Sequence, residues 1–210
     1  MKDLQLRAQM CEVGRRLWQR GLVGATEGNL SARISPQRIL CTPSGLSKGH
    51  LRPADLVVID NHGVSIEGGE PSSEIKMHLR IYQVRPDCQA VVHAHPPIAT
   101  GFALAGEDIP DDLLPESMVV LGSVATVPFA MPGTDEVPNA LEPLLEDHKS
   151  FLLGHHGAVV LGKDLVDACY RMETLERIAQ IIATAKAIGK PRPMPAKAFD
   201  KLQKYLNGRL

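Results

Sequence analysis

The sequence predicts a single α/β domain that spans residues 1–210, because helix-like and strand-like patterns alternate along the chain. This length suits one sizeable core but is short for two domains. No internal repeat, low-complexity tract or linker-like stretch divides the sequence. The apolar share of 44% and the charged share of 22% are those of an ordinary globular protein.

The first third of the chain predicts a helix followed by short strands. Apolar residues recur at helical spacing in the first segment: Leu6, Met10, Val13 and Leu17. Gly21 then stands where a C-cap glycine would end that helix. Strand-like patterns follow in four segments: 24–34, 38–46, 55–60 and 64–68. Asn61-His62-Gly63 is a plausible hairpin connection between the last two segments.

The middle of the chain predicts a helix, a buried strand and a second helix. Residues 71–86 are expected to form the first of these two helices, with Ser72 or Ser73 as its N-cap. One of its faces is apolar: Ile75, Leu79 and Tyr82. Residues 89–96 are an apolar run closed by Pro96, which is typical of a buried strand, and residues 97–106 are expected to be helical.

The remainder of the chain predicts three more strand-like regions and a long helix. The strand-like regions are 118–122, 125–130 and 151–162, the last of which contains two strands around a His-Gly turn. Residues 139–148 predict a weak helix. Asp164 is expected to cap a long helix that ends near Gly189. Its apolar side is formed by four residues: Leu165, Cys169, Met172 and Leu175. One further helical turn is expected in the tail that contains Tyr205.

The sharpest chemical signal is His93-Ala94-His95, at the end of the apolar strand. Residues two apart in a strand point to the same face, so both imidazoles can share one metal ion. Two hydrogen-bonded histidines at a sheet end are the alternative. Other metal-binding families with an HxH pair do not fit this sequence. The pair is not succeeded by the Asp-His of a metallo-β-lactamase or the nearby Glu of a cupin, and an amidohydrolase barrel needs about 250 residues.

Two other segments offer partners for this pair. His155-His156-Gly157 lies in a tight turn, so at least one imidazole could project from the same sheet edge, although such a turn is often only a surface feature. Glu74 follows Ser72 and Ser73 at the start of the predicted helix. That arrangement fits ordinary capping and the helix dipole, and it equally fits a phosphate site. The residues alone leave these alternatives open.

Read together, the motifs are more specific than any one of them. In order they are GNLSAR, TPSGLSKGHL, DLVVID, PSSE, VVHAHP, PGT and HHG. In this order and at these separations they resemble the class II aldolase/adducin family, in particular its L-fuculose-1-phosphate aldolases, along nearly the whole chain. The resemblance implies a three-layer fold in which helices flank a mainly antiparallel central sheet.

The resemblance also implies the active-site residues and the cofactor. The implied metal ligands are His93, His95 and His156, and His155 is only their neighbour. Glu74 is implied to be the catalytic acid/base and a further ligand in the resting enzyme. The implied metal is Zn²⁺, with Mn²⁺ or Co²⁺ as alternatives. The implied phosphate pocket has six residues: Gly28, Asn29, Ser44, Gly45, Ser72 and Ser73.

The implied reaction is cleavage of a 1-phosphoketose into dihydroxyacetone phosphate and an aldehyde. One departure from the family concerns a tyrosine between the HxH strand and the PGT turn, because residues 111–122 contain none. We therefore expect a less polar aldehyde pocket and 5-deoxyribulose or 5-methylthioribulose 1-phosphate as substrate. Tyr205 resembles the family's other active-site tyrosine, which a neighbouring subunit contributes, and a tyrosine on a frayed tail is the alternative.

Several related functions remain alternatives. The same metal-stabilised enolate would serve a sugar-phosphate epimerase, a methylthioribulose-phosphate dehydratase or a decarboxylase of a phosphorylated sugar acid. A non-catalytic adducin-like interaction domain would keep the fold but lack the full metal set. The presence of all four expected residues argues against that domain: His93, His95, His156 and Glu74.

Charge and cysteine content narrow the expected partners and location. The net charge of -1 argues against a nucleic-acid partner. No apolar run approaches the roughly 20 residues of a membrane span, and the N-terminus lacks the apolar core of a signal peptide. The four cysteines show no CxxC pairing, which is typical of free thiols in a reducing compartment. We expect a cytoplasmic protein that binds a small phosphorylated sugar and forms the family's homotetramer, with active sites between subunits.

Overall fold

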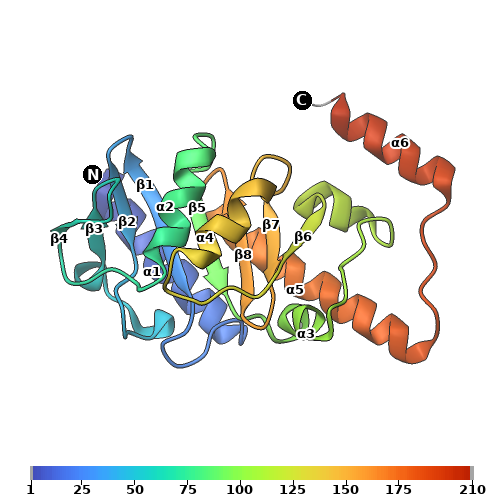
Figure 1. Cartoon of the computed structure of the whole chain (residues 1–210), viewed down its shortest axis with the longest axis horizontal. Coiled ribbons are helices and arrows are strands. Elements are labelled where there is room, and N and C mark those ends of the chain that lie inside the picture. The colour runs from blue at the N-terminus through green and yellow to red at the C-terminus, as the bar shows by residue number, and fades with distance from the viewer. Residues whose placement is uncertain (1, 209–210) are drawn as a thin grey trace.

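The computed structural model describes residues 2–208 and is built around one eight-stranded sheet (Figure 1). The strands are β1 Asn29–Ser35, β2 Arg38–Cys41, β3 Val57–Ile59, β4 Ser65–Glu67, β5 Ala90–Ala94, β6 Val124–Val127, β7 Ser150–Leu153 and β8 Gly157–Gly162. Their order across the sheet is β4-β3-β2-β1-β5-β8-β7-β6. Every neighbouring pair is antiparallel except β6 and β7. The sheet is therefore mainly antiparallel, as the family resemblance implied.

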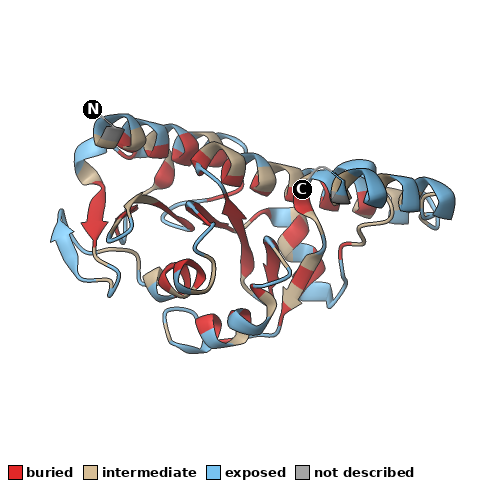
Figure 2. Ribbon diagram, turned by 90° about the horizontal axis from the view of Figure 1, so that it is seen from above, coloured by how far each residue is buried: buried red, intermediate tan, exposed pale blue. Residues whose placement is uncertain are grey.

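Helices cover both faces of this sheet and complete three layers (Figure 1). The α-helices are α1 Lys2–Gln19, α2 Ile75–Val84, α3 Pro97–Ala105, α4 Glu136–Leu141, α5 Leu165–Ile188 and α6 Ala196–Asn207, of which α6 packs on neither face (Figure 1). α1, α3 and α5 pack on one face, whereas α2 and α4 pack on the other. In Figure 2 the buried residues gather in the sheet and on the inner sides of these helices.

The alternation of side chains along β5 decides which layer faces the histidine motif. Val92 packs with the α1, α3 and α5 layer, and Val91 packs with the α2 and α4 layer. His93 is two residues from Val91, so it also points toward the side of α2. The strand therefore directs His93 to the layer in which Glu74 directly precedes α2.

Two predicted helix ends are confirmed. The apolar stripe of the first helix is buried, and Gly21 adopts a left-handed φ of 70° after it. The Leu22 amide donates to the carbonyl of Leu17 at 2.9 Å, which closes the helix end. At the other end of the chain, the Asp164 carboxylate accepts a hydrogen bond of 2.8 Å from the Asp167 amide and caps α5.

The predicted strand at 118–122 is wrong, because Ser117–Leu121 forms a π-helical turn. Ser117 and Leu121 are buried while Val119 between them is 51% exposed. Burial four residues apart is a helical spacing. The valines suggested a strand through their β-propensity, and tertiary packing overrides that preference here.

Three helix predictions need adjustment. α2 begins at Ile75 without a side-chain cap, and the Ser72 hydroxyl instead accepts from the Glu74 amide at 3.3 Å in the turn before it. The weak helix expected at 139–148 is α4 followed by a 3-10 turn at Glu142–Leu144. The C-terminal helix α6 has 12 residues, more than the single expected turn.

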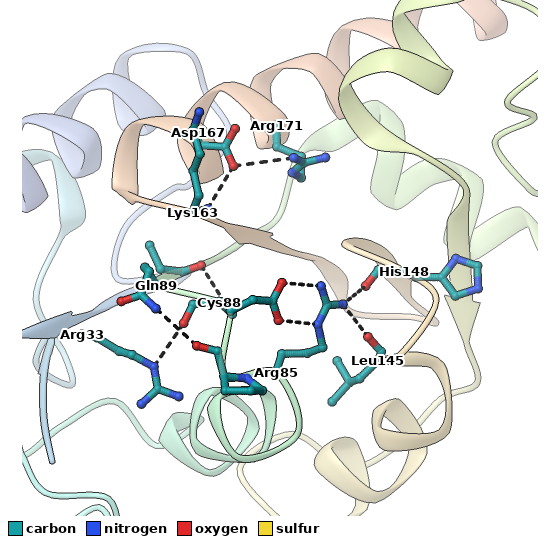
Figure 3. A network of polar contacts seen from close by, with 12 residues as sticks. Arg33, Arg85, Cys88, Gln89, Leu145, His148, Lys163, Asp167 and Arg171 are labelled. Carbon is teal, nitrogen blue, oxygen red and sulfur yellow. Dashed lines mark hydrogen bonds and ion pairs between the residues drawn. The ribbon is translucent and has the colours of Figure 1, made fainter. Parts of the chain in front are cut away.

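A polar network anchors the sheet at the end opposite the histidine motif (Figure 3). Arg85, which follows α2, forms two hydrogen bonds with the Asp87 carboxylate and donates to the carbonyls of Leu145 and His148. Arg33 of β1 donates to the carbonyl of Cys88, just before β5, at 3.1 Å. The network therefore fixes the far ends of α2 and β5, whose other ends carry Glu74 and His93.

Two expectations from composition are consistent with the structure. No helix among residues 2–208 is long and apolar enough to cross a membrane. All four cysteines are free thiols, and three of them are buried: Cys41, Cys88 and Cys169.

Candidate metal and phosphate site

The end of β5 and the turn between β7 and β8 bring three imidazoles together. His93 and His95 come from the strand and its end, and His156 comes from the turn. The ring centroids are 5.0, 4.7 and 5.2 Å apart, and one nitrogen of each ring lies within 4.8 Å of the other two. The three predicted ligands are thus grouped around one point.

The hydrogen bond of His93 directs its other ring nitrogen toward this point. Nδ1 lies 2.9 Å from the carbonyl oxygen of Ala158, which can only accept, so Nδ1 carries a hydrogen. In the neutral ring, Nε2 then presents a lone pair toward His95 Nε2 and Glu74 Oε2, each 3.2 Å away. It has no proton for that carboxylate. A cation between these atoms resolves the conflict, and fixing of the ring by its second nitrogen is usual for metal-binding histidines.

The spacing of the ring nitrogens fits a small divalent ion. A tetrahedral zinc site with bonds of about 2.0–2.1 Å places its ligand nitrogens about 3.4 Å apart. The His93 and His95 Nε2 atoms are 3.2 Å apart. The donor set of three imidazoles also suits zinc chemistry and leaves a coordination position open.

The turn distinguishes its two histidines. His155 has a left-handed φ of 54°, is exposed and lies against the Phe129 ring. His156 Nε2 lies 3.2 Å from Oε1 of Glu74. The left-handed residue turns the chain so that the two neighbouring side chains diverge. His156 is therefore the member of the pair that joins the cluster, as the resemblance implied.

Burial keeps the imidazoles of His95 and His156 neutral near pH 7. It is the main effect that lowers the pKa of His156 to about 4, and the proximity of the His93 imidazole adds to it. The same two causes lower the pKa of His95. Neutral imidazole is the form that ligates metal, so neither ring has to lose a proton first.

Glu74 lies among these rings as an ionised carboxylate. Burial acts to raise the pKa of the Glu74 carboxyl, but the neighbouring imidazoles of His93 and His156 and the hydrogen bond from Asn29 hold it well below its ordinary value. Asn29 Nδ2 donates to Oε2 at 2.8 Å. Oε1 is buried and has no hydrogen-bond partner within residues 2–208. A buried, unsatisfied anionic oxygen beside three imidazoles is the second observation that fits a bound cation.

The three segments of the predicted phosphate pocket lie side by side. The Thr42 amide donates to the Leu30 carbonyl at 3.0 Å, and the Ser72 amide donates to the Thr42 carbonyl at 3.3 Å. The Ser44 amide donates to the Glu70 carbonyl at 3.1 Å, which holds the same segments together. Ser44, Gly45 and Ser73 are exposed and Ser72 is half-buried, so a ligand can reach them.

Gly28 and Asn29 complete this set, but the Asn29 side chain is engaged elsewhere. Gly28 has a left-handed φ of 67°, and a Cβ at this position would lie 2.7 Å from the His93 carbonyl oxygen. Asn29 is only 3% exposed, and its amide contacts Glu74 and His78. In this structure the Asn29 amide thus donates to the Glu74 carboxylate.

Sequence reasoning missed Lys48, which ties the pocket loops together. Lys48 is 3% exposed, and its Nζ donates to the carbonyls of Thr26 and Leu46, both at 2.7 Å. Burial lowers the pKa of this ammonium group to about 8, against the opposing effect of the Glu74 carboxylate. Its only signal was its place inside the TPSGLSKGHL motif.

Tyr205 does not reach the histidines of its own chain. α6, which carries it, stands well away from the end of β5 (Figure 1). The Tyr205 side chain is 53% exposed. Its predicted catalytic role therefore requires a neighbouring subunit.

This fold and site define a known class of proteins. The family model described as the class II aldolase and adducin N-terminal domain matches residues 8–183, and the chain belongs to this family. Its relatives are enzymes with more than one activity, so the chain is assigned to the enzymes of the class II aldolase superfamily.

Two relatives and one solved structure illustrate the range of activities among the proteins that this chain resembles. The chain is 34% identical to a 3-oxo-tetronate 4-phosphate decarboxylase of Haemophilus influenzae, over 88% of this chain and 90% of the relative. It is also 34% identical to a 5-methylthioribulose-1-phosphate/5-deoxyribulose-1-phosphate aldolase of Rhodospirillum rubrum, over 96% and 91%. A solved L-fuculose 1-phosphate aldolase shares 30% identity with a TM-score of 0.88, over 97% of this chain and 96% of that one.

We predict that His93→Ala lowers the bound divalent metal strongly, whereas His155→Ala keeps most of it. His93 faces the centre of the cluster and His155 faces Phe129. Metal content after dialysis, measured by mass spectrometry on folded protein, checks this. Loss of metal in His155→Ala together with its retention in His156→Ala would show that the other histidine of the turn is the ligand.

Gly157→Ala is expected to disturb the same cluster by packing alone. A Cβ at this position would lie 2.6 Å from the Ala94 carbonyl oxygen and 2.6 Å from Cδ2 of His95. We expect a loss of about 1–3 kcal/mol in the free energy of unfolding and a lower metal content. The control is Gly101→Ala, whose Cβ would meet no atom within 4 Å. Equal stability and metal content in both variants would refute the contact.

Proposed function

We propose that this protein is a metal-dependent carbon–carbon lyase that acts on a small phosphorylated sugar, with Zn²⁺ as its metal and Mn²⁺ or Co²⁺ as alternatives. The observation that carries the proposal is the convergence of His93, His95, His156 and an ionised Glu74 beside three candidate phosphate-binding segments. When bound, the metal supplies a Lewis acid for the negative charge that develops when the bond breaks.

The protein's own groups hold the two ends of the substrate. The exposed hydroxyls of Ser44 and Ser73, with the open backbone at Gly45 between these segments, are suited to bind the phosphate. Lys48 contributes a positive charge between two of these loops. Anchoring the non-reacting end in this way orients the bond to be broken beside Glu74.

Glu74 is the group placed to handle the proton at carbon. Cleavage leaves an electron pair on the carbon that becomes part of dihydroxyacetone phosphate, and that carbon must then gain a proton. The ionised carboxylate reaches both His93 and His156, so it can take up a proton, from the hydroxyl that becomes the aldehyde or from water, and then deliver it to that carbon. Such a role typically contributes about 10²–10⁴-fold to the rate.

The first candidate reaction is aldol cleavage that releases an apolar aldehyde. Phe129 and Met131, exposed by 56% and 50%, belong to the loop after β6. This loop lies near two segments of the site, because Phe129 contacts His155 in the turn that carries His156 and Gly133 lies near Ser73. An apolar border fits 5-deoxyribulose or 5-methylthioribulose 1-phosphate better than fuculose 1-phosphate. The Rhodospirillum rubrum relative carries both of these substrates in its name.

The second candidate is decarboxylation of a phosphorylated 3-oxo sugar acid, as in the name of the Haemophilus influenzae relative. Aldol cleavage must remove a proton from the hydroxyl that becomes the aldehyde. Loss of CO₂ breaks the bond to a carboxylate and needs no proton transfer at the leaving group. Residues 111–122 contain no tyrosine for such a transfer, and this feature favours decarboxylation.

We further propose a homotetramer with active sites between subunits, in which Tyr205 serves a neighbouring site. The position of α6, away from the β5 end of its own chain, supports this (Figure 1). Residues 1–210 are proposed to act as one cytoplasmic domain without a nucleic-acid or membrane partner. Epimerase, dehydratase and adducin-like functions remain alternatives that product analysis separates.

Product analysis tests the function. We expect dihydroxyacetone phosphate from 5-deoxyribulose 1-phosphate or 5-methylthioribulose 1-phosphate with release of an aldehyde, or from 3-oxo-tetronate 4-phosphate with release of CO₂. A chelator should abolish turnover and Zn²⁺ should restore it. A strong preference for fuculose 1-phosphate would reject the apolar pocket. Conversion without any dihydroxyacetone phosphate would reject the lyase.

We predict that Glu74→Gln loses about 10²–10⁴-fold in kcat while it still binds metal and phosphate. The amide keeps the shape of the side chain but cannot carry a proton. Steady-state kinetics and metal content check this, with Glu70→Gln, an exposed glutamate in the same segment, as the control. Near-normal turnover in Glu74→Gln would remove Glu74 from its proposed role.

A further inference from the structure

A buried line of polar side chains leads from the interior of α2 to the Glu74 carboxylate. Its members are almost fully buried, with exposed fractions of 4, 0, 1 and 3% for Tyr82, Ser31, His78 and Asn29. The line has four links: Tyr82 OH to Ser31 Oγ at 2.8 Å, Ser31 Oγ to His78 Nδ1 at 2.6 Å, His78 Nε2 to Asn29 Oδ1 at 2.6 Å, and Asn29 Nδ2 to Glu74 Oε2 at 2.8 Å.

The ionised Glu74 and the neutral His78 fix the direction of every hydrogen bond in this line. Glu74 is ionised and can only accept, so Asn29 turns its NH₂ group to it and its oxygen to His78. His78 Nε2 must then donate to that oxygen. A neutral His78 accepts at Nδ1 from the Ser31 hydroxyl, which in turn accepts from Tyr82. All four bonds thus point toward Glu74.

The neutral state of His78 follows from its surroundings. Burial is the main effect that lowers the pKa of His78 to about 3, and the proximity of the His93 imidazole adds to it. An ordinary core histidine would also be neutral and hydrogen-bonded. The difference here lies in the partner, because the Asn29 amide that His78 orients has its other end on a carboxylate beside the reacting centre.

We propose that His78 is a positioning residue, which acts through Asn29 to hold the Glu74 carboxylate toward His93 and His156. The proposal rests on the proposed function of Glu74 as the proton carrier. Without the Nε2 hydrogen of His78, Asn29 Oδ1 is left buried without a donor. The amide would shift to satisfy this oxygen, its bond to Glu74 Oε2 would be lost, and the carboxylate would turn away from His93 and His156.

The kinetic test uses His78→Leu and His78→Gln, with Tyr82→Phe as a matched control. His78→Leu should lower kcat by about 10–100-fold, because small displacements of a reacting group cost this much, and should leave KM and metal content within about threefold. A glutamine amide can donate and accept, so His78→Gln should recover part of kcat. Tyr82→Phe removes a buried hydrogen bond that does not touch Asn29, so it should lower Tm and keep kcat.

Combining His78→Leu with Glu74→Gln separates positioning from structure. If His78 acts through Glu74, the double variant should have the kcat of Glu74→Gln alone, since no carboxylate remains to be held. Multiplied losses would reject the proposal. Equal falls in kcat for His78→Leu and Tyr82→Phe would also reject it, because they would show a general loss of packing.

A crystal structure of His78→Leu tests the same idea without turnover. We expect a displaced Asn29 amide and a displaced Glu74 carboxylate in an otherwise unchanged fold. An unchanged Asn29–Glu74 bond would overturn the proposal even if the enzyme is the expected lyase. Conversely, wild-type protein without lyase activity would overturn the proposed function, while the displaced carboxylate would still establish the positioning contact.

Discussion

The site depends on one constraint, which is that an ionised carboxylate is held largely out of water between imidazoles. Such a charge is costly to bury unless it is paired and hydrogen-bonded. Glu74 meets this condition with Asn29 on one side and with His93 and His156 on the other. The same arrangement brings the lone pair of His93 Nε2 close to those of His95 Nε2 and Glu74 Oε2, and a cation between these atoms would relieve the repulsion. The buried Glu74 carboxylate and the candidate metal site are therefore parts of one electrostatic arrangement.

The sheet supplies the geometry for this arrangement. β1, β5 and β8 are neighbours at its centre, and their register places Asn29 opposite His93 and Ala158 opposite Ala94. Three adjacent strand ends thus supply the hydrogen-bond partner of the carboxylate, the candidate metal ligands and the carbonyl that orients His93. Glu74 joins them from α2, whose far end is fixed by Arg85. The site is built on regular elements, and this favours precise distances.

Local pattern predicted the features that local geometry decides. The HxH pair follows from the period of a strand, the first and last caps follow from Gly21 and Asp164, and the family resemblance supplied the sheet type and His156. The π-helical turn at Ser117–Leu121 was missed because its valines favour strands. Lys48 and His78 were missed because their roles depend on partners in other segments, 22 and 49 residues away. A histidine on an apolar helix face was a signal in the sequence, but the pattern did not identify its partner.

The loop that carries Phe129 and Met131 has a consequence for substrate choice under the proposed function. It contacts the turn that carries His156 without supplying an imidazole, and it connects β6 to α4 outside the central strands. Replacements in this loop would alter the pocket for the departing fragment while the imidazole cluster keeps its geometry.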